Sequence, residues 1–191
     1  MDRGLLILAS GTGSLAQAII EASQSGELSA DILALLTDQP DAEVVAKCAA
    51  LSIPIITHPL HGDREAWNEE LFLITESLNP TLVVSAGFMR ILSPQYVSTY
   101  KVINIHPSLL PKFPGAHAVR DALDAKADVT GTTIHWVDAG VDTGKVITSH
   151  EVPILAGDTQ EQLHERIKIV ERGLIVATIS QVLDFLETSD E

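Results

Sequence analysis

The segment VINIHPSLLPKFPG, residues 102–115, predicts a buried strand that ends abruptly in a proline-rich loop. Three of its first four residues are β-branched, and the two-residue period of a strand places Asn104 and His106 on one face. Pro107 keeps His106 extended, so the imidazole lies where the strand ends. An amide that stabilises a carbonyl oxygen beside an imidazole that transfers a proton is typical of an acyl-transfer site. The same pair would also suit the capping of loop carbonyls.

Composition favours one globular domain spanning residues 1–191, with 46% hydrophobic residues. The apolar run at residues 5–9 is too short for a membrane span or signal-peptide core, so we expect a cytoplasmic protein with no membrane partner. Cys48 is the only cysteine, which excludes an intramolecular disulfide. We expect Cys48 to be a small residue of the core. The net charge of −14 disfavours a nucleic-acid partner. Any small anionic ligand must therefore be held by local contacts.

Apolar segments alternate with helical patterns along most of the chain, which predicts a doubly wound α/β fold with a mainly parallel sheet and helices on both faces. Alternating segments at residues 129–137 and 145–152 predict an antiparallel C-terminal extension. A long amphipathic helix should begin at Thr159 and run to about Leu186. In such sheets ligands bind at the carboxyl ends of the strands. The expected parallel strands span residues 4–10, 32–36, 53–57, 81–85 and 102–106.

A glycine loop, GTGS at residues 11–14, joins the first expected strand to a helix. Glycines permit close backbone approach and the helix start offers free N–H groups, so the segment could bind a phosphate. It could equally be a tight turn without a ligand. With Asp38 at the end of the second strand, it also resembles a dinucleotide-binding fingerprint.

Other candidate residues leave their roles open. His58 and His61 lack a third metal ligand at suitable spacing, which favours ordinary loop residues. The apolar loop at residues 86–92 could line a flat aromatic ligand or cover the core. His135 and His150 lie in expected strands without an evident partner.

Asp142 lies in a loop between Gly140 and Gly144. These glycines would let a ligand approach the backbone, although Asp142 could simply be a turn residue.

Taken in order, the motifs SGTGS, AGFMRILS, NIHPSLLPKFPG, GTTIHWV and VDTG resemble the phosphoribosylglycinamide formyltransferases of purine biosynthesis, within the wider formyl-tetrahydrofolate transferases. The resemblance covers nearly the whole chain. It implies transfer of a formyl group from 10-formyltetrahydrofolate, as cosubstrate, to the amine of 5'-phosphoribosylglycinamide, without a metal. It leaves open whether the protein is a monomer or a homodimer.

By this resemblance, Asn104, His106 and Asp142 form the catalytic trio. Asn104 and a protonated His106 would stabilise the tetrahedral oxyanion, and Asp142 would orient the imidazole and favour its charged form. The resemblance assigns ribotide binding to Gly13, Ser14, Leu15 and Glu171, and folate binding to Arg64, Met89, Arg90, Ile91, Leu92, Asn104 and Val141.

Leu15 departs from the family pattern, because many relatives carry Asn there. The loss of a side-chain donor predicts weaker ribotide binding or a different substrate.

Several alternatives remain. A formyl-tetrahydrofolate hydrolase would use water in place of the amine. A methionyl-tRNA formyltransferase is disfavoured by the acidic charge. A nicotinamide-dependent oxidoreductase would explain residues 11–38 but not the second half of the chain, and a folate-binding module without catalysis is also open.

Overall fold

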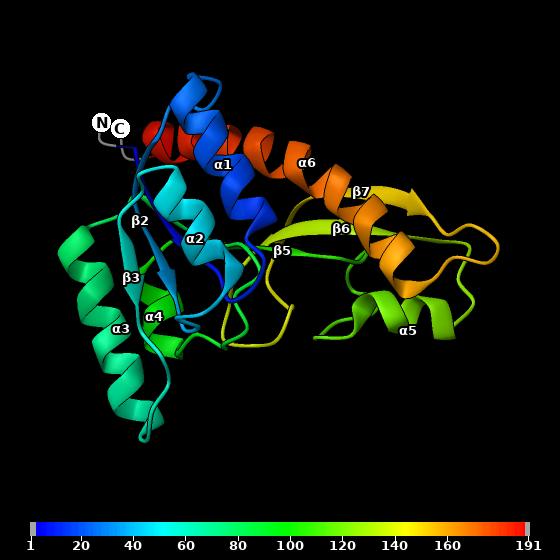
Figure 1. Cartoon of the computed structure of the whole chain (residues 1–191), viewed down its shortest axis with the longest axis horizontal. Helices are drawn as coiled ribbons and strands as arrows, with labels where there is room; N and C mark the ends of the chain where they lie inside the picture. The colour runs from blue at the N-terminus through cyan, green and yellow to red at the C-terminus, as the bar shows by residue number, and fades with distance from the viewer. Residues whose placement is uncertain (1–2, 190–191) are drawn as a thin grey trace.

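A computed structural model describes residues 3–189, which form one seven-stranded sheet flanked by helices (Figure 1). The strand order is β3-β2-β1-β4-β5-β6-β7. The strands are β1 (Gly4–Leu8), β2 (Asp31–Thr37), β3 (Ile55–Thr57), β4 (Leu82–Ser85), β5 (Val102–His106), β6 (Val129–Trp136) and β7 (Val146–Pro153). The helices are α1 (Ser14–Ser25), α2 (Glu43–Ala50), α3 (Arg64–Leu78), α4 (Pro94–Thr99), α5 (Ala118–Asp124) and α6 (Gln160–Ser189).

Strands β1 to β5 are parallel, and β6 and β7 pair antiparallel, so the doubly wound fold with its antiparallel extension is confirmed. The chain builds from β1 outward to β3, returns to place β4 on the other side of β1, and then continues outward to β7. All five residues of β1 are buried, as expected of a central strand covered on both faces. The direction in which strands are added to the sheet therefore reverses between β1 and β4, and sheets of this type have a crevice at that point.

Helices cover both faces of the sheet (Figure 1). Apolar residues of α1, α2 and the second half of α6 form one core with β1, β4 and β5. Trp67 and Leu71 of α3 and Tyr96 of α4 form the core on the opposite face. A smaller cluster joins α5 to the first half of α6. Cys48 is buried in the first core, as predicted.

Local signals set most element boundaries. The Ser93 hydroxyl accepts a hydrogen bond from Tyr96 N–H and caps α4. Strand β3 is shorter than expected and begins at Ile55, because Pro54 has no N–H and contributes only its carbonyl, which accepts from Leu35 N–H. Helix α1 ends at Ser25 and is followed by Gly26 in the left-handed conformation, which suits a helix C-terminus.

Helix α6 is 30 residues long and connects the two halves of the molecule (Figure 1). Thr159 and Gln162 form a reciprocal capping box at its start. Near its other end, Asp184 and Glu187 pair with Arg3, just before β1. Among residues 3–189, no helix combines the length and apolar character needed to cross a membrane.

Candidate active site

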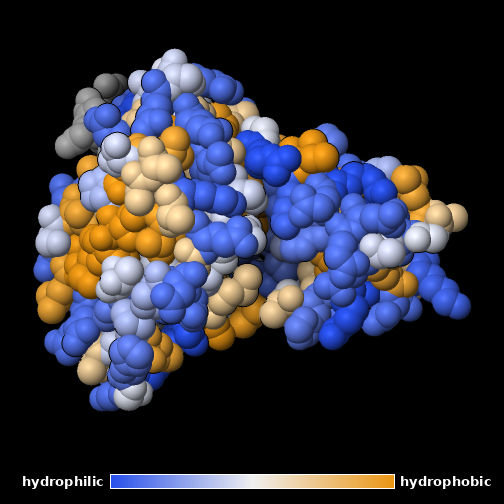
Figure 2. All heavy atoms as spheres, in the orientation of Figure 1, coloured by the Kyte–Doolittle hydropathy of each residue, from blue (hydrophilic) through white to orange (hydrophobic). Residues whose placement is uncertain are grey.

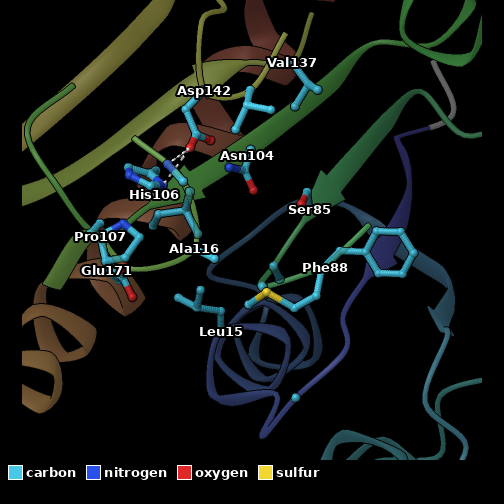
Figure 3. Close-up of a pocket in the computed structure, with 18 of the residues that line it drawn as sticks. Leu15, Ser85, Phe88, Asn104, His106, Pro107, Ala116, Val137, Asp142 and Glu171 are labelled. Atoms are coloured by element: carbon cyan, nitrogen blue, oxygen red, sulfur yellow. Dashed lines mark hydrogen bonds and ion pairs between the residues drawn. The ribbon is translucent and has the colours of Figure 1, made fainter. Parts of the chain in front are cut away.

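A cavity of about 570 Å³ opens at the carboxyl ends of β1, β4 and β5, as predicted. We call it the central cavity. Figure 2 shows it as a hollow between the two parts of the surface, and Figure 3 shows its lining. In Figure 3, Glu171 and Leu15 lie toward one end, Phe88 and Val137 toward the other, and the expected catalytic trio lies between them. All predicted site residues line this cavity except Arg64.

His106 is buried at the end of β5 and both of its ring nitrogens face acceptors. Nε2 lies 2.8 Å from the carbonyl of Phe113, and because a carbonyl only accepts, Nε2 carries a hydrogen. Nδ1 lies 3.4 Å from Oδ2 of Asp142. The ring is therefore oriented by the Phe113 carbonyl on one side and by the Asp142 carboxylate on the other.

The Asp142 side chain is only 12% exposed and faces two imidazoles. Its Oδ2 accepts from Gly115 N–H at 2.7 Å, and its Oδ1 lies 3.6 Å from Nε2 of His135. The contact with His135 and the Gly115 hydrogen bond hold the pKa of Asp142 below its usual value, although burial opposes this. Asp142 is therefore a carboxylate at neutral pH, and the trio expected from the sequence is brought together.

Gly140 and Gly144, which lie on either side of Asp142, are needed for the conformation of the loop. A side chain at Gly144 would overlap the carbonyl of Trp136, and one at Gly140 would overlap the Thr143 hydroxyl. Asp138 accepts from Gly140 N–H and from the Thr143 hydroxyl, which folds the loop tightly. Contacts within the loop therefore require both glycines, and Gly140 also lines the cavity, where a ligand can approach its backbone.

His135 is a site residue that sequence reasoning missed. It lies directly opposite Asn104 in the antiparallel register of β5 and β6. Its Nδ1 donates to the Trp136 carbonyl at 2.9 Å, and its Nε2 lies 3.3 Å from the amide nitrogen of Asn104. The same Nε2 lies 3.6 Å from Oδ1 of Asp142, and it can serve only one of these two neighbours at a time. In either case the Asn104 NH₂ group keeps at least one hydrogen for a ligand oxygen. Only the strand register, which the sequence does not state, reveals this contact.

The other end of the cavity combines the glycine loop with one face of α6. Gly13 adopts a left-handed conformation with φ of 71°, and α1 begins directly after it. Leu15 is 8% exposed and packs into the core beside the cavity. The lining residues of α6 are Gln160, His164, Lys168 and Glu171. Sequence reasoning found only Glu171, although the helical spacing of the other three was a usable signal.

Glu171 is 4% exposed, and its Oε1 lies 3.3 Å from the Thr132 hydroxyl. The same hydroxyl lies 3.2 Å from the carbonyl of His106. One hydroxyl hydrogen serves only one of these acceptors at a time. Burial raises the pKa of Glu171 to about 7, with the Thr132 contact opposing the shift. The Thr132 hydroxyl therefore lies between the Glu171 carboxyl group and the backbone carbonyl of His106 and contacts both.

The loop after β4 forms the remaining wall. The side chains of Met89 and Ile91 are 70% and 61% exposed. Arg90 pairs with the buried Asp38, whose Oδ2 accepts from Arg90 Nε at 2.6 Å. Arg64 lies behind this wall, where it donates to the Ile91 carbonyl and stacks on Trp67. Because Asp38 is buried in this pairing and does not line the cavity, it is not placed to bind a nucleotide ribose.

The comparisons with known proteins agree with this geometry. A model of the family described as formyl transferase matches residues 3–179. The chain belongs to the formyl transferase family. It is 46% identical over 180 residues to phosphoribosylglycinamide formyltransferase of Mycobacterium tuberculosis, covering 92% of this chain and 83% of that protein.

Two further relatives support the family membership. The enzyme of the same name from Escherichia coli is 38% identical over 186 residues, which are 94% of this chain and 87% of that protein. The crystal structure of glycinamide ribonucleotide transformylase 1 from Symbiobacterium toebii superposes with a TM-score of 0.93 at 31% identity, covering 96% of this chain and 88% of that one.

His58 and His61, which were considered as metal ligands, differ in exposure, because His61 lies at the surface. His58 is buried, its Nε2 lies 3.0 Å from the Trp67 carbonyl, and its ring stacks on the Trp67 indole. His58 therefore holds the start of α3. Across residues 3–189, no cluster of three or more His, Cys, Asp or Glu side chains is arranged to hold a metal ion.

Glu171→Gln should stabilise the fold in a pH-dependent manner. The folded state binds the Glu171 proton more tightly than the unfolded chain, since its pKa rises from 4.5 to about 7. The stability gained from this proton is full below pH 4.5 and is lost as the pH rises to 7. At pH 8 the variant should therefore exceed the wild type by up to about 3 kcal/mol. The difference should shrink toward pH 5.

Urea unfolding at pH 5 and pH 8 measures this effect. A stability difference that is the same at both pH values would contradict the raised pKa.

Proposed function

We propose that the chain transfers the formyl group of 10-formyltetrahydrofolate to the amine of 5'-phosphoribosylglycinamide, as a step of de novo purine biosynthesis. The observation that carries the proposal is the meeting of Asn104, His106 and Asp142 midway along a cavity with two different ends. The phosphoribosylglycinamide formyltransferases named above share most of their length with this chain. We infer a cytoplasmic enzyme that acts on small molecules, and the acidic charge disfavours a nucleic-acid partner.

In the proposed reaction, the amine nitrogen attacks the formyl carbon and the carbonyl electron pair moves onto oxygen. The free N–H of Asn104 and the charged His106 stabilise this oxyanion. A donor of this kind typically lowers a barrier by about 3 to 4 kcal/mol. The carbon–N10 bond then breaks as His106 gives a proton to N10, and His106 regains a proton from the nitrogen of the attacking amine. This proton is the one on Nδ1, because the Nε2 hydrogen is held by the Phe113 carbonyl. Asp142 keeps the imidazole charged until that transfer.

The ribotide fits the end of the cavity that is formed by the glycine loop and α6. The N–H groups at Gly13, Ser14 and Leu15 lie at the start of α1, where a phosphate is favoured. Lys168 adds a cation from α6. Glu171, when ionised, would accept hydrogen bonds from the ribose hydroxyls. This set supports ribotide binding without the side-chain donor that Leu15 lacks.

The folate fits the opposite end, between the loop after β4 and the Asp142 loop. Met89 and Ile91 offer apolar surface, and Val141 is 50% exposed on the facing wall. Arg90 and the buried Leu92 also line the cavity. Arg64 lies behind the loop after β4, where one N–H donates to the Ile91 carbonyl, and its remaining N–H groups would be available to the anionic tail of the folate.

Formyl transfer itself is the first test. Purified protein is mixed with 10-formyltetrahydrofolate, and tetrahydrofolate release is followed with and without the ribotide. Release that requires the ribotide is the expected result. Equal release without it would indicate a hydrolase, and no release in either case would contradict the proposal.

Asp142→Asn should lower kcat by about a hundredfold or more, because His106 loses the charge that favours its protonated form. The amide oxygen can still accept from Gly115, so folate binding should persist. Steady-state kinetics and folate titration measure the two effects. Asp124→Asn, an exposed acid on α5, is the charge-matched control. Near-normal turnover of Asp142→Asn would remove Asp142 from the catalytic trio.

Gly13→Val should raise the ribotide KM by more than about tenfold, because the displaced loop loses hydrogen bonds to a charged phosphate. The glycine φ of 71° and the Val44 side chain, which a Cβ at this position would overlap, leave no room for valine. The folate KM of the same variant is the internal control. An unchanged ribotide KM would show that this loop does not hold the phosphate.

A further inference from the structure

The carboxylate of Asp38 is buried next to the central cavity but does not line it. The side chain is 1% exposed at the end of β2. It accepts three hydrogen bonds, from the Ser10 hydroxyl at 2.5 Å, Arg90 Nε at 2.6 Å and Gln39 Nε2 at 3.1 Å. Burial alone would raise the pKa of Asp38, but these donors hold it below its usual value. The group is thus a charged carboxylate that the proposed chemistry does not use.

The partners of Asp38 connect it to the loop at residues 87–92, which we call the folate loop. Arg90 belongs to this loop. Ser10 gives its single hydroxyl hydrogen to Asp38, and its oxygen accepts from Met89 N–H at 2.8 Å. The backbone N–H of Ser10 also donates to the Gly87 carbonyl at 3.1 Å. Three positions of the folate loop are therefore fixed to the ends of β1 and β2.

The arrangement determines which groups of the folate loop face the cavity. The Arg90 guanidinium is directed toward Asp38 and its charge is neutralised there. The apolar side chains of Met89 and Ile91 remain exposed beside the cavity. In water, exposed apolar side chains of this size would gain by collapsing onto each other or into the cavity. An ion pair on the far side of the loop opposes that movement.

We propose that Asp38 is a positioning residue for the folate cosubstrate, which acts through Ser10 and Arg90 to hold the folate loop in its binding conformation. This inference rests on the proposed function, because it takes the folate as the ligand of the loop. Asp38 does not touch the folate in this proposal. It removes the cost of ordering the loop at each binding event.

Asp38→Ala should raise the KM for 10-formyltetrahydrofolate by about tenfold, since a small displacement of a positioning loop has effects of at least this size. The ribotide KM should change by less than about twofold, because the glycine loop and α6 keep their contacts. Asp41→Ala, an exposed acid three residues away, is the matched control and should leave both values unchanged.

Ser10→Ala is the second variant and keeps the buried ion pair. It removes only the hydroxyl that links Asp38 to Met89, so it should show the same selective rise in the folate KM at smaller magnitude. Because the change is small, this variant keeps the proposal testable if Asp38→Ala fails to fold.

A spectroscopic measurement reports the loop without any folate. Phe88 of the folate loop stacks on Trp67 with 6.4 Å between ring centroids. In a Trp136→Phe background, Trp67 is the only tryptophan of the chain. Its fluorescence should change when Asp38 or Ser10 is replaced and should not change in Asp41→Ala.

The outcomes separate the two proposals. A selective rise in the folate KM with a changed Trp67 signal supports the positioning role. An unchanged folate KM, or a loss of activity that affects both substrates in parallel with thermal stability, would overturn it while leaving the proposed function intact. If the wild type transfers no formyl group, the proposed function fails, and an unchanged Trp67 signal in the variants would then overturn the positioning role separately.

Discussion

Parallel strands cannot be joined by a tight turn, and this constraint determines where the active site lies. Each return to the same edge of the sheet needs a crossover, and here the crossovers carry α1 to α4. Because β2 and β3 lie on one side of β1 and β4 on the other, the loops that leave β1 and β4 diverge. The central cavity lies between them. The chain places its glycine loop, its folate loop and the Asn104 strand at this one edge.

The sequence was sufficient for the fold class, but not for the contacts that surround Asn104, His106 and Asp142. Hydrophobic periodicity and the caps at Ser93 and Thr159 depend on neighbours within a few residues, which a sequence pattern contains. The contact between Asn104 and His135 depends on the register of β5 against β6. The pairing of Asp38 with Arg90 joins residues 52 positions apart, through the packing of the folate loop on the sheet.

Charge illustrates the same difference between local and long-range information. The net charge of −14 would repel anions at a distance, yet each cation near the cavity has a specific environment. Arg64 donates to the Ile91 carbonyl of the folate loop, and Arg90 of that loop is paired with Asp38. At the end formed by the glycine loop and α6, Lys47 donates to the Thr12 carbonyl and Lys168 lines the cavity while paired with Glu165. Arg64 and Arg90 therefore stabilise the conformation of the folate loop, whereas Lys168 places a positive charge at the opposite end of the cavity.

The pairing of Arg3 with Asp184 and Glu187 brings the two ends of the described chain to one corner of the molecule (Figure 1). Along α6, Glu171 lies about 20 Å from Asp184 by helix rise alone. A polypeptide attached at either end would thus pull on the start of β1 and the last turns of α6, and the load would be shared across one ion-pair cluster. The cavity lies outside that path, so this fold suits a catalytic unit that is tethered, fused or circularly permuted at a single corner.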